Sequence, residues 1–173
     1  HTGDTPCTDH HAVIVPDAAL YNLSANSTNT TDGGYYGSAL RTSGLDAAKS
    51  TISGAFEADH ILTHRQLLTN VVSSGASSGW AWYDSQIGLM NEHMVYGAYA
   101  WGGGVQNGYD TGIGKSQLPL FRARPDLISN GESWWLRDVR STIDFSAVNG
   151  KGHADYYGAS ANIGVRPAFL LIG

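Results

Sequence analysis

Two histidines four residues apart, His60 and His64, are the first candidates for chemistry in this chain of 173 residues. On one face of a helix, this spacing is typical of metal ligands. Thr63 is a good N-cap residue, however, and a helix that begins there leaves His60 outside it. We therefore expect one partly buried histidine and one surface histidine rather than a metal site. His10 and His11 are expected to lie in an exposed segment.

Paired carboxylates would indicate acid–base chemistry, and Asp59, Asp84 and Glu92 are the candidates. Their spacing does not set any two at the separation that glycoside hydrolysis requires. The sequence has no Gly-x-Ser-x-Gly elbow, P-loop or His-Glu-x-x-His motif, and the single Cys7 excludes a two-cysteine redox or zinc motif. We predict a protein that is not an enzyme and uses no cofactor or metal. The minor alternative is a depolymerase or a metal-dependent oxidase, which bound metal or glycan turnover would support.

Composition narrows the possible partners. The chain has 42% hydrophobic residues, enough for the core of one domain, but only 14% charged residues and as many as 22 glycines. Its net charge of −5 includes no cluster of Lys and Arg, which argues against a nucleic-acid partner. No apolar run approaches the roughly 20 residues that cross a bilayer, so we expect no membrane insertion. We expect residues 1–11 to be a tail or linker of a longer protein and residues 12–173 to form one domain.

The first half of the chain shows helical periodicity. Ala12–Pro16 is typical of a short strand, and residues 24–34 are typical of a polar loop. Residues 43–56 are expected to form an amphipathic helix that Ser43 caps. The apolar residues expected to share one face of this helix are Leu45, Ala48, Ile52 and Phe56.

The following residues predict a second helix and then strands. Residues 60–62 could be a strand that enters a helix capped by Thr63 and ended by residues 73–75. The apolar stripe of this helix would be Leu67, Leu68, Val71 and Val72. A short helix over residues 85–95 would turn Ile87, Met90 and Met94 inward. A glycine-rich loop is expected over residues 101–114, followed by short strands and loops from residue 117 onward. Helices first and strands last indicate an α+β fold.

The last forty residues have a different composition. Two aromatic and apolar blocks, Trp134–Val139 and Gly164–Ile172, bracket a polar stretch from Thr142 to Ile163. Within that stretch, Tyr156 and Tyr157 lie among Asp, Gly and Ser, a setting closer to the contact surface of an antibody than to a core. Other aromatic residues are expected in or beside the core, namely Trp80, Trp134, Trp135 and Phe169.

Alternation between residues 151 and 157 sharpens this interpretation. With the period of two that a strand imposes, one side would carry Lys151, His153, Asp155 and Tyr157. The other side would carry Gly152, Ala154 and Tyr156. The small residues could then lie against the body of the domain while the chemically diverse ones project. An ordinary solvated hairpin accounts for the same pattern.

Several motifs together suggest a family. The ending combines Trp134–Val139, Phe145–Val148 and Gly164–Phe169, and upstream motifs include His60–Arg65 and Leu89–Glu92. This combination resembles the C-terminal receptor-binding domains of phage tail fibres and tail-tip proteins from gut Gram-positive hosts, over nearly the whole chain after about residue 12. The resemblance implies a C-type-lectin-like fold of the formylglycine-generating-enzyme type. Such a fold is α+β, with short twisted antiparallel strands, two or three helices and long ordered loops.

The resemblance also divides the ending into two sets of residues. In related proteins of diversity-generating retroelements, such an ending is rewritten at adenine-rich codons to change receptor preference. The implied framework is Trp134, Trp135, Leu136, Arg137, Phe145, Val148, Gly152, Ala154, Gly164, Val165, Arg166, Pro167 and Phe169. The implied ligand-contact positions are Thr142, Ile143, Asp144, Ser146, Lys151, His153, Asp155, Tyr156, Tyr157, Ser160, Asn162 and Ile163. Because this set also exposes Tyr156, we expect a bulge or turn near Tyr157-Gly158.

Two departures limit what the resemblance implies. The sulfatase-activating oxidases of this fold bind copper through a pair of cysteines, and the calcium lectins use Glu-Pro-Asn or Gln-Pro-Asp with Trp-Asn-Asp; neither set is present. The expected function is thus non-catalytic recognition of a bacterial surface protein or glycan at the tip of a phage tail fibre, in an extracellular virion tail. Clustering, for example as a homotrimer, would raise avidity. Arg137 and Arg166 are expected to pin the framework through hydrogen bonds. The alternative is a bacterial cell-surface adhesin or lectin module of the same fold.

Overall fold

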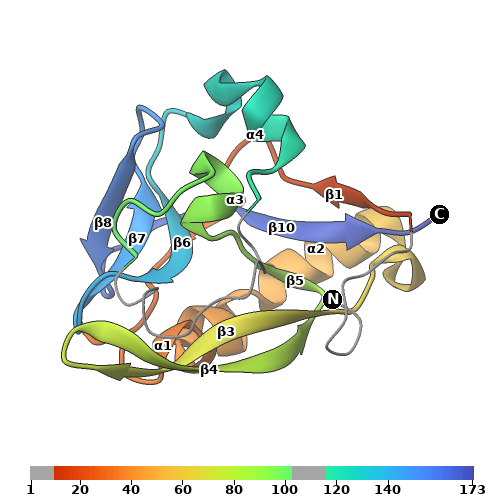
Figure 1. Ribbon diagram of the computed structural model, residues 1–173. Coiled ribbons are helices and arrows are strands. Elements are labelled where there is room, and N and C mark those ends of the chain that lie inside the picture. Colours follow the sequence, from red (N-terminus) through yellow and green to blue (C-terminus); the bar gives the residue numbers. More distant parts are fainter. Residues whose placement is uncertain (1–9, 103–115) are drawn as a thin grey trace.

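The computed structural model describes residues 10–102 and 116–173, and these form an α+β structure with three sheets (Figure 1). The expected α+β class is confirmed. The expected tail, residues 1–11, lies mostly outside the described residues, and His10 and His11 at its end are exposed as expected. Most of the expected glycine-rich loop also lies outside them. None of the described helices is long and apolar enough to cross a bilayer.

A five-stranded sheet contains most of the C-terminal segment. Its order is β2-β9-β6-β7-β8, so β8 lies at an edge among the described strands. Trp134 on β6 pairs in parallel with Gly164 on β9, whereas the other neighbours are antiparallel. The strands are β2 (Tyr21–Leu23), β6 (Trp134–Val139), β7 (Asp144–Val148), β8 (Ala154–Gly158) and β9 (Ile163–Val165).

A second sheet joins the two ends of the described domain. Its central strand is β10 (Pro167–Leu171), which pairs antiparallel with both β1 (Ala12–Ile14) and β5 (Ile87–Leu89). The strand expected at Ala12 is therefore confirmed. Arg166 alone separates β9 from β10, so the chain passes directly from one sheet to the other.

A long hairpin replaces the second helix expected from Thr63 onward. Strands β3 (His64–Ser73) and β4 (Ala76–Ser85) pair antiparallel. Ser74 and Gly75 both have positive φ, 52° and 79°, which is the geometry of a two-residue hairpin turn. The prediction was wrong because an apolar run of this length fits either period, and the Ser-Ser-Gly sequence that ends a helix also makes a tight turn.

The first expected helix is present, with a different beginning. Helix α2 (Asp46–Phe56) follows a π-helical turn, η1 (Leu40–Gly44), so Ser43 does not cap it. The expected face is buried at Ala48 and Ile52, while Phe56 stays 39% exposed. Two shorter helical segments flank this region, α1 (Gly34–Gly37) and η2 (Ala58–His60). The strand expected over 60–62 is reduced to a single bridge at Ile61.

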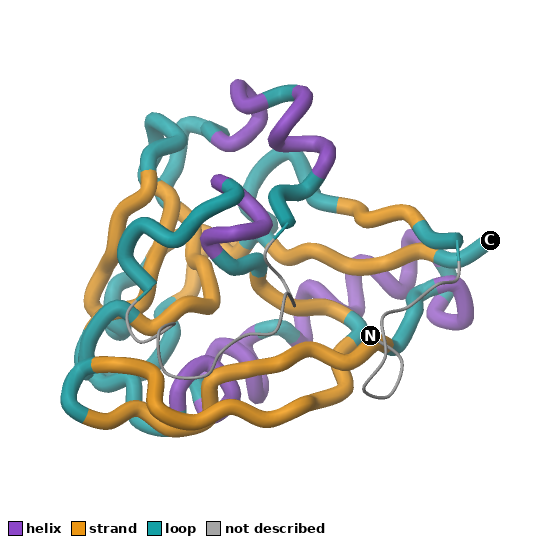
Figure 2. Tube along the Cα trace, in the orientation of Figure 1, coloured by secondary structure: helices purple, strands orange, loops and turns teal. Residues whose placement is uncertain are grey.

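The middle of the chain also differs from expectation. Residues 85–95 form β5 and then α3 (Glu92–Tyr96), not one helix. Ile87 and Met90 are buried as expected. The residues after 117, where we expected strands and loops, first form α4 (Pro119–Ala123) and η3 (Pro125–Ile128). Figure 2 shows these two helical segments above the sheets.

The five-stranded sheet has a core on each face. Trp134 packs with Val148 on one face, and Trp135 packs with Phe145 on the other, as expected for neighbours on a strand. Trp134, Trp135 and Phe169 are at most 2% exposed, and Trp80 is half-buried and lines a small pocket beside the core. The expected core aromatic residues are thus confirmed, and both faces of the sheet are fixed by packing.

Candidate ligand-binding surface

The expected framework of the C-terminal segment is largely buried. Eleven of its thirteen residues are buried, and Gly152 and Ala154 are half-buried. Arg166 lies 2% exposed and donates hydrogen bonds to the carbonyl oxygens of Pro16, Leu127 and Ile128 at 2.8–3.2 Å. Arg137 donates a longer one, 3.5 Å, to the carbonyl of Leu89. Both arginines pin the framework as expected.

The expected contact residues fall on the β7–β8 hairpin and the turns around it. Five are half-buried, namely Asp144, Asp155, Tyr156, Tyr157 and Ile163, and one, Ser146, is buried. The six that are exposed are Thr142, Ile143, Lys151, His153, Ser160 and Asn162. We call these six exposed residues together with Tyr156 the hairpin surface.

Three of the expected contact residues belong to the interior instead. Ser146 has no exposed surface, because β7 is covered on both sides. Tyr157 packs its ring edge-on against Trp135, with centroids 6.4 Å apart, and its hydroxyl lies 3.0 Å from that of Ser133. Ile163 packs against the same core cluster. Assigning Ser146 to ligand contact was wrong, because a fully buried hydroxyl cannot meet a ligand.

Tyr156 faces the opposite side of β8 from Tyr157. Pairing between β7 and β8 is regular from Ala154 to Gly158, so the expected bulge is absent from this ladder, and the turn begins only after Gly158. The guanidinium of Arg140 lies 4.3 Å from the ring centroid of Tyr156, and the ring of Trp101 meets it edge-on at 5.0 Å. Tyr156 is thus part of an aromatic cluster at the surface.

The turn from Asn149 to His153 is held by the side chain of its first residue, Asn149. Asn149 Oδ1 accepts hydrogen bonds from the backbone amides of Lys151 and His153, at 3.0 and 3.1 Å. Gly152 has a φ of 82°, which a residue with a Cβ would rarely adopt, and its carbonyl accepts a bond from the Tyr96 hydroxyl. Lys151 and His153 therefore project from a fixed backbone.

The opposite end of the hairpin is held by the loop at residues 24–34, which was expected only to be polar. Asn29 Oδ1 accepts hydrogen bonds from the amide and the hydroxyl of Ser160, at 2.9 and 2.7 Å. Thr31 donates its hydroxyl proton to the carbonyl of Ser141 at 2.7 Å. This loop contributes to the site by fixing the turns that carry Thr142 and Ser160.

Sequence reasoning did not find the interaction between Glu92 and Asp138. Glu92 has no exposed surface and Asp138 is half-buried, and Asp138 accepts a 2.7 Å hydrogen bond from the backbone amide of Glu92. Burial, and then the charge of Glu92, raise the pKa of Asp138 to about 7. Glu92 lies at the start of α3 and Asp138 lies on β6, and nothing in their separation along the chain indicates that they meet.

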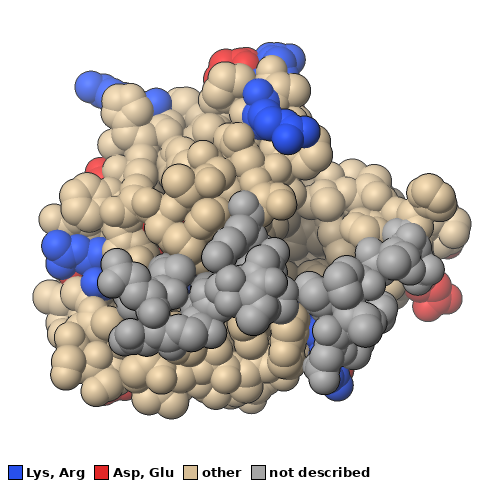
Figure 3. All heavy atoms as spheres, viewed as in Figure 1, with Lys and Arg blue, Asp and Glu red and all other residues tan. Residues whose placement is uncertain are grey.

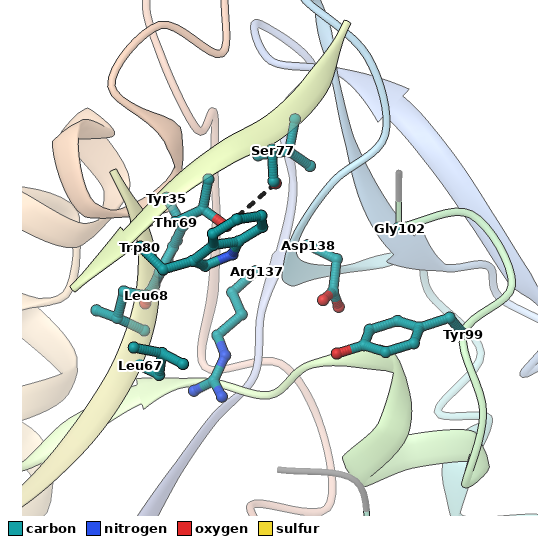
Figure 4. Close-up of a pocket in the computed structure, with 11 residues that line it drawn as sticks. Tyr35, Leu67, Leu68, Thr69, Ser77, Trp80, Tyr99, Gly102, Arg137 and Asp138 are labelled. Carbon is teal, nitrogen blue, oxygen red and sulfur yellow. Dashed lines mark hydrogen bonds between the residues drawn. The ribbon is translucent and has the colours of Figure 1, made fainter. Parts of the chain in front are cut away.

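The space beside this pair is small. A cavity of about 20 Å³ is lined by Asp138, Tyr99, Arg137 and Trp80 among others, and Figure 4 shows these side chains around it. That volume holds about one water molecule. A substrate therefore does not fit in this pocket beside Asp138.

The histidines behave as the sequence indicated. His60 is exposed and His64 is 8% exposed, and burial lowers the pKa of His64. In the part of the chain that the structure describes, no group of three His, Cys, Asp or Glu residues could hold a metal ion. Figure 3 shows that the Lys and Arg side chains visible in this view are scattered among mostly uncharged groups.

Comparison of the chain with family models, curated proteins and solved structures finds no match.

Proposed function

We propose that this protein is a non-catalytic receptor-binding domain with a C-type-lectin-like fold, and that it recognises a bacterial surface protein or glycan at the tip of a phage tail fibre. The hairpin surface would make the contact. The resemblance of the C-terminal motifs to tail-fibre domains supports the biological setting, and retroelement diversification of the hairpin surface belongs to the same proposal.

One observation carries the proposal: exposed side chains of varied chemistry stand on a backbone that buried residues and side-chain hydrogen bonds hold fixed. Asn149 holds one turn and Asn29 the other. A contact surface that is already ordered loses less conformational entropy when it binds. Exposed positions on such a frame can also change without disturbing the core.

The pair of carboxylates at Glu92 and Asp138 supports a non-catalytic function. Glu92 and Asp138 are the pair most similar to catalytic groups, because the pKa of Asp138 is raised to about 7. The pocket that Asp138 lines, at about 20 Å³, is too small for a substrate. Glu92 also accepts hydrogen bonds from three backbone amides, so its carboxylate is engaged in holding the chain.

The proposal is tested with a triple variant, Ile143→Ala, Lys151→Ala and His153→Ala, whose side chains are all exposed. Fluorescently labelled protein is titrated onto a panel of Gram-positive gut bacteria. We expect the triple variant to bind at least about tenfold more weakly, because a few central side chains carry most of an interface's energy.

A matched control replaces a β-branched aliphatic residue, a lysine and a histidine elsewhere, with Val71→Ala, Lys49→Ala and His60→Ala. These side chains are also exposed or largely so. The control should bind like the original protein. Equal binding by the triple variant and the control would reject the hairpin surface as the contact. Tail genes beside the coding gene would support the tail-fibre setting, whereas anchoring or pilus genes would indicate an adhesin.

A further inference from the structure

Trp101 lies at the hairpin surface although it comes from a distant part of the chain. Its side chain is among the large exposed hydrophobic groups, at 42% exposure. Its ring meets Tyr156 edge-on at 5.0 Å, and Tyr156 carries the guanidinium of Arg140 on its ring. Arg140 in turn lies 3.6 Å from the carboxylate of Asp144. Two aromatic rings, a cation and an anion are thus grouped at one place.

The backbone around Trp101 is held by a buried carboxylate. Glu92 has no exposed surface and accepts hydrogen bonds from the amides of Ala100, Trp101 and Gly102 at 2.8–3.1 Å. Burying a carboxylate is strongly unfavourable unless such charge-assisted hydrogen bonds offset the lost hydration. The residue that these bonds place, Trp101, keeps 42% of its surface exposed.

An exposed tryptophan held in this way requires an explanation outside core packing. If Trp101 served the core, it would be buried like Trp134 and Trp135. Its position instead adds a flat apolar surface beside the residues of the hairpin surface. Rigid aromatic side chains give a large contact area at low entropic cost.

We propose that Trp101, Tyr156 and Arg140 form a saccharide-contact surface, and that Glu92 is the positioning residue that holds Trp101 in it. This inference rests on the proposed function and extends it to residues outside the C-terminal segment. The exposed ring of Trp101 would stack on the apolar face of a sugar ring, and Tyr156 would support that ring through their edge-on contact. Arg140, which Asp144 holds by an ion pair, would donate hydrogen bonds to sugar hydroxyls. An apolar wall with a few polar groups is the usual composition of a ligand site.

The edge of the sheet favours a saccharide over an extended peptide. A peptide could add a strand to β8, which is the edge strand among those described. The Tyr156 amide, however, already donates a 2.9 Å hydrogen bond to Asp155 Oδ1, the side chain of its own neighbour. An edge strand of only five residues, with one of its backbone amides already bonded to a side chain, is poorly suited to pairing with another chain.

A second aromatic group provides a matched control. Tyr36 is 36% exposed, stacks on Tyr83 with centroids 3.6 Å apart, and has the Arg41 guanidinium 4.6 Å from its ring. Arg41 also lines an open hollow of about 580 Å³. This group has similar chemistry but comes from α1, η1 and β4 and contains none of the residues of the hairpin surface.

The first test compares Trp101→Ala, Trp101→Phe and Tyr36→Ala for binding to the bacterial panel and to cell-wall polysaccharide purified from those strains. We expect Trp101→Ala to bind about tenfold more weakly or worse, Trp101→Phe to lose less than about threefold, and Tyr36→Ala to match the original protein. Unchanged binding by Trp101→Ala, or a loss confined to Tyr36→Ala, would overturn the assignment of Trp101.

Treatment of the cells identifies the chemistry of the receptor. Periodate, which cleaves vicinal diols of sugars, should abolish binding, whereas protease treatment should not. Binding that survives periodate and is lost with protease would overturn the saccharide assignment and leave a protein receptor. Weaker binding by the hairpin triple variant alone, with Trp101→Ala unaffected, would reject this inference but keep the proposed function. No binding of the original protein to any strain or polysaccharide would reject both.

The role of Glu92 has its own readout. With 5-fluorotryptophan incorporated, the five tryptophans give separate ¹⁹F signals, and Trp101→Phe identifies the one from residue 101. In Glu92→Gln we expect that signal to move toward the value of an unfolded chain while the others stay in place, and binding to fall with it. Ala100→Pro removes one amide donor and leaves Glu92 intact, so it makes the same test if Glu92→Gln does not fold. An unchanged signal and unchanged binding in a folded variant would overturn the positioning role.

Discussion

Asp138 shows how a single residue can link the core to the surface. Its carboxylate accepts a hydrogen bond from the backbone amide of Glu92. The carboxylate of Glu92 in turn accepts a hydrogen bond from the backbone amide of Trp101. At this scale the sequence identified the arginines that pin the framework, because their neighbours form a recognisable motif. It did not identify the Glu92–Asp138 interaction, since a contact between an isolated helix start and a strand leaves no local pattern.

The raised pKa of Asp138 predicts how stability depends on pH. The folded state binds this proton more tightly than the unfolded chain, in which the carboxyl titrates near pH 4. Stability from this group is therefore fully present below about pH 4 and falls as the pH rises to about 7. Asp138→Asn keeps an oxygen for the Glu92 amide and removes the titration. We expect this variant to gain on the order of 2 kcal/mol at pH 8 and little at pH 4.

Thermal unfolding of both proteins at pH 4 and pH 8 measures this effect. The pKa of His64 is lowered by burial, so His64 destabilises both proteins as the pH falls and cancels in the comparison. An equal difference between the two proteins at both pH values would show that folding does not raise the pKa of Asp138.

At the scale of elements, the hairpin β3–β4 shows where sequence patterns have limited power. The helix from Asp46 to Phe56 was predictable because three turns of apolar residues share one face. The stretch from His64 to Ser73 is shorter and mixes leucines with β-branched residues, so helix and strand fit about equally well. The two-residue turn at Ser74-Gly75 decides the outcome, because its geometry directs the chain back along itself.

This turn gives a prediction about stability. Gly75 has a φ of 79°, where an alanine is strained, so Gly75→Ala should destabilise the fold by about 1 kcal/mol. Ser74 has a φ of 52°, which asparagine tolerates better, and Ser74→Asn should be neutral or slightly stabilising. Urea unfolding of the two variants measures both effects. Gly54 is helical and its Cβ would meet no atom within 4 Å, so Gly54→Ala should instead stabilise, which makes it a control.

At the scale of the whole molecule, the hairpin surface and the described ends of the chain lie on opposite sides. Figure 1 shows β8 on one side and both β1 and the C-terminal end of β10 on the other. Pairing of β1 with β10 holds these two ends together. Attachment to a fibre ahead of β1 would therefore point the hairpin surface away from the attachment.

This arrangement predicts that clustering strengthens binding. Joining three copies through a trimeric coiled coil placed ahead of β1 leaves the three hairpin surfaces free. We expect the apparent affinity for cells to rise by about 10²–10⁴, because the second and third contacts form at high effective concentration. Titration of labelled trimer and monomer onto the same strain measures the gain. A trimer that carries Ile143→Ala, Lys151→Ala and His153→Ala should lose most of its binding. The same coiled coil inserted at residues 160–162 should block binding, because it would cover the hairpin surface itself. Equal binding by monomer and trimer would argue against a surface that faces outward from the fibre.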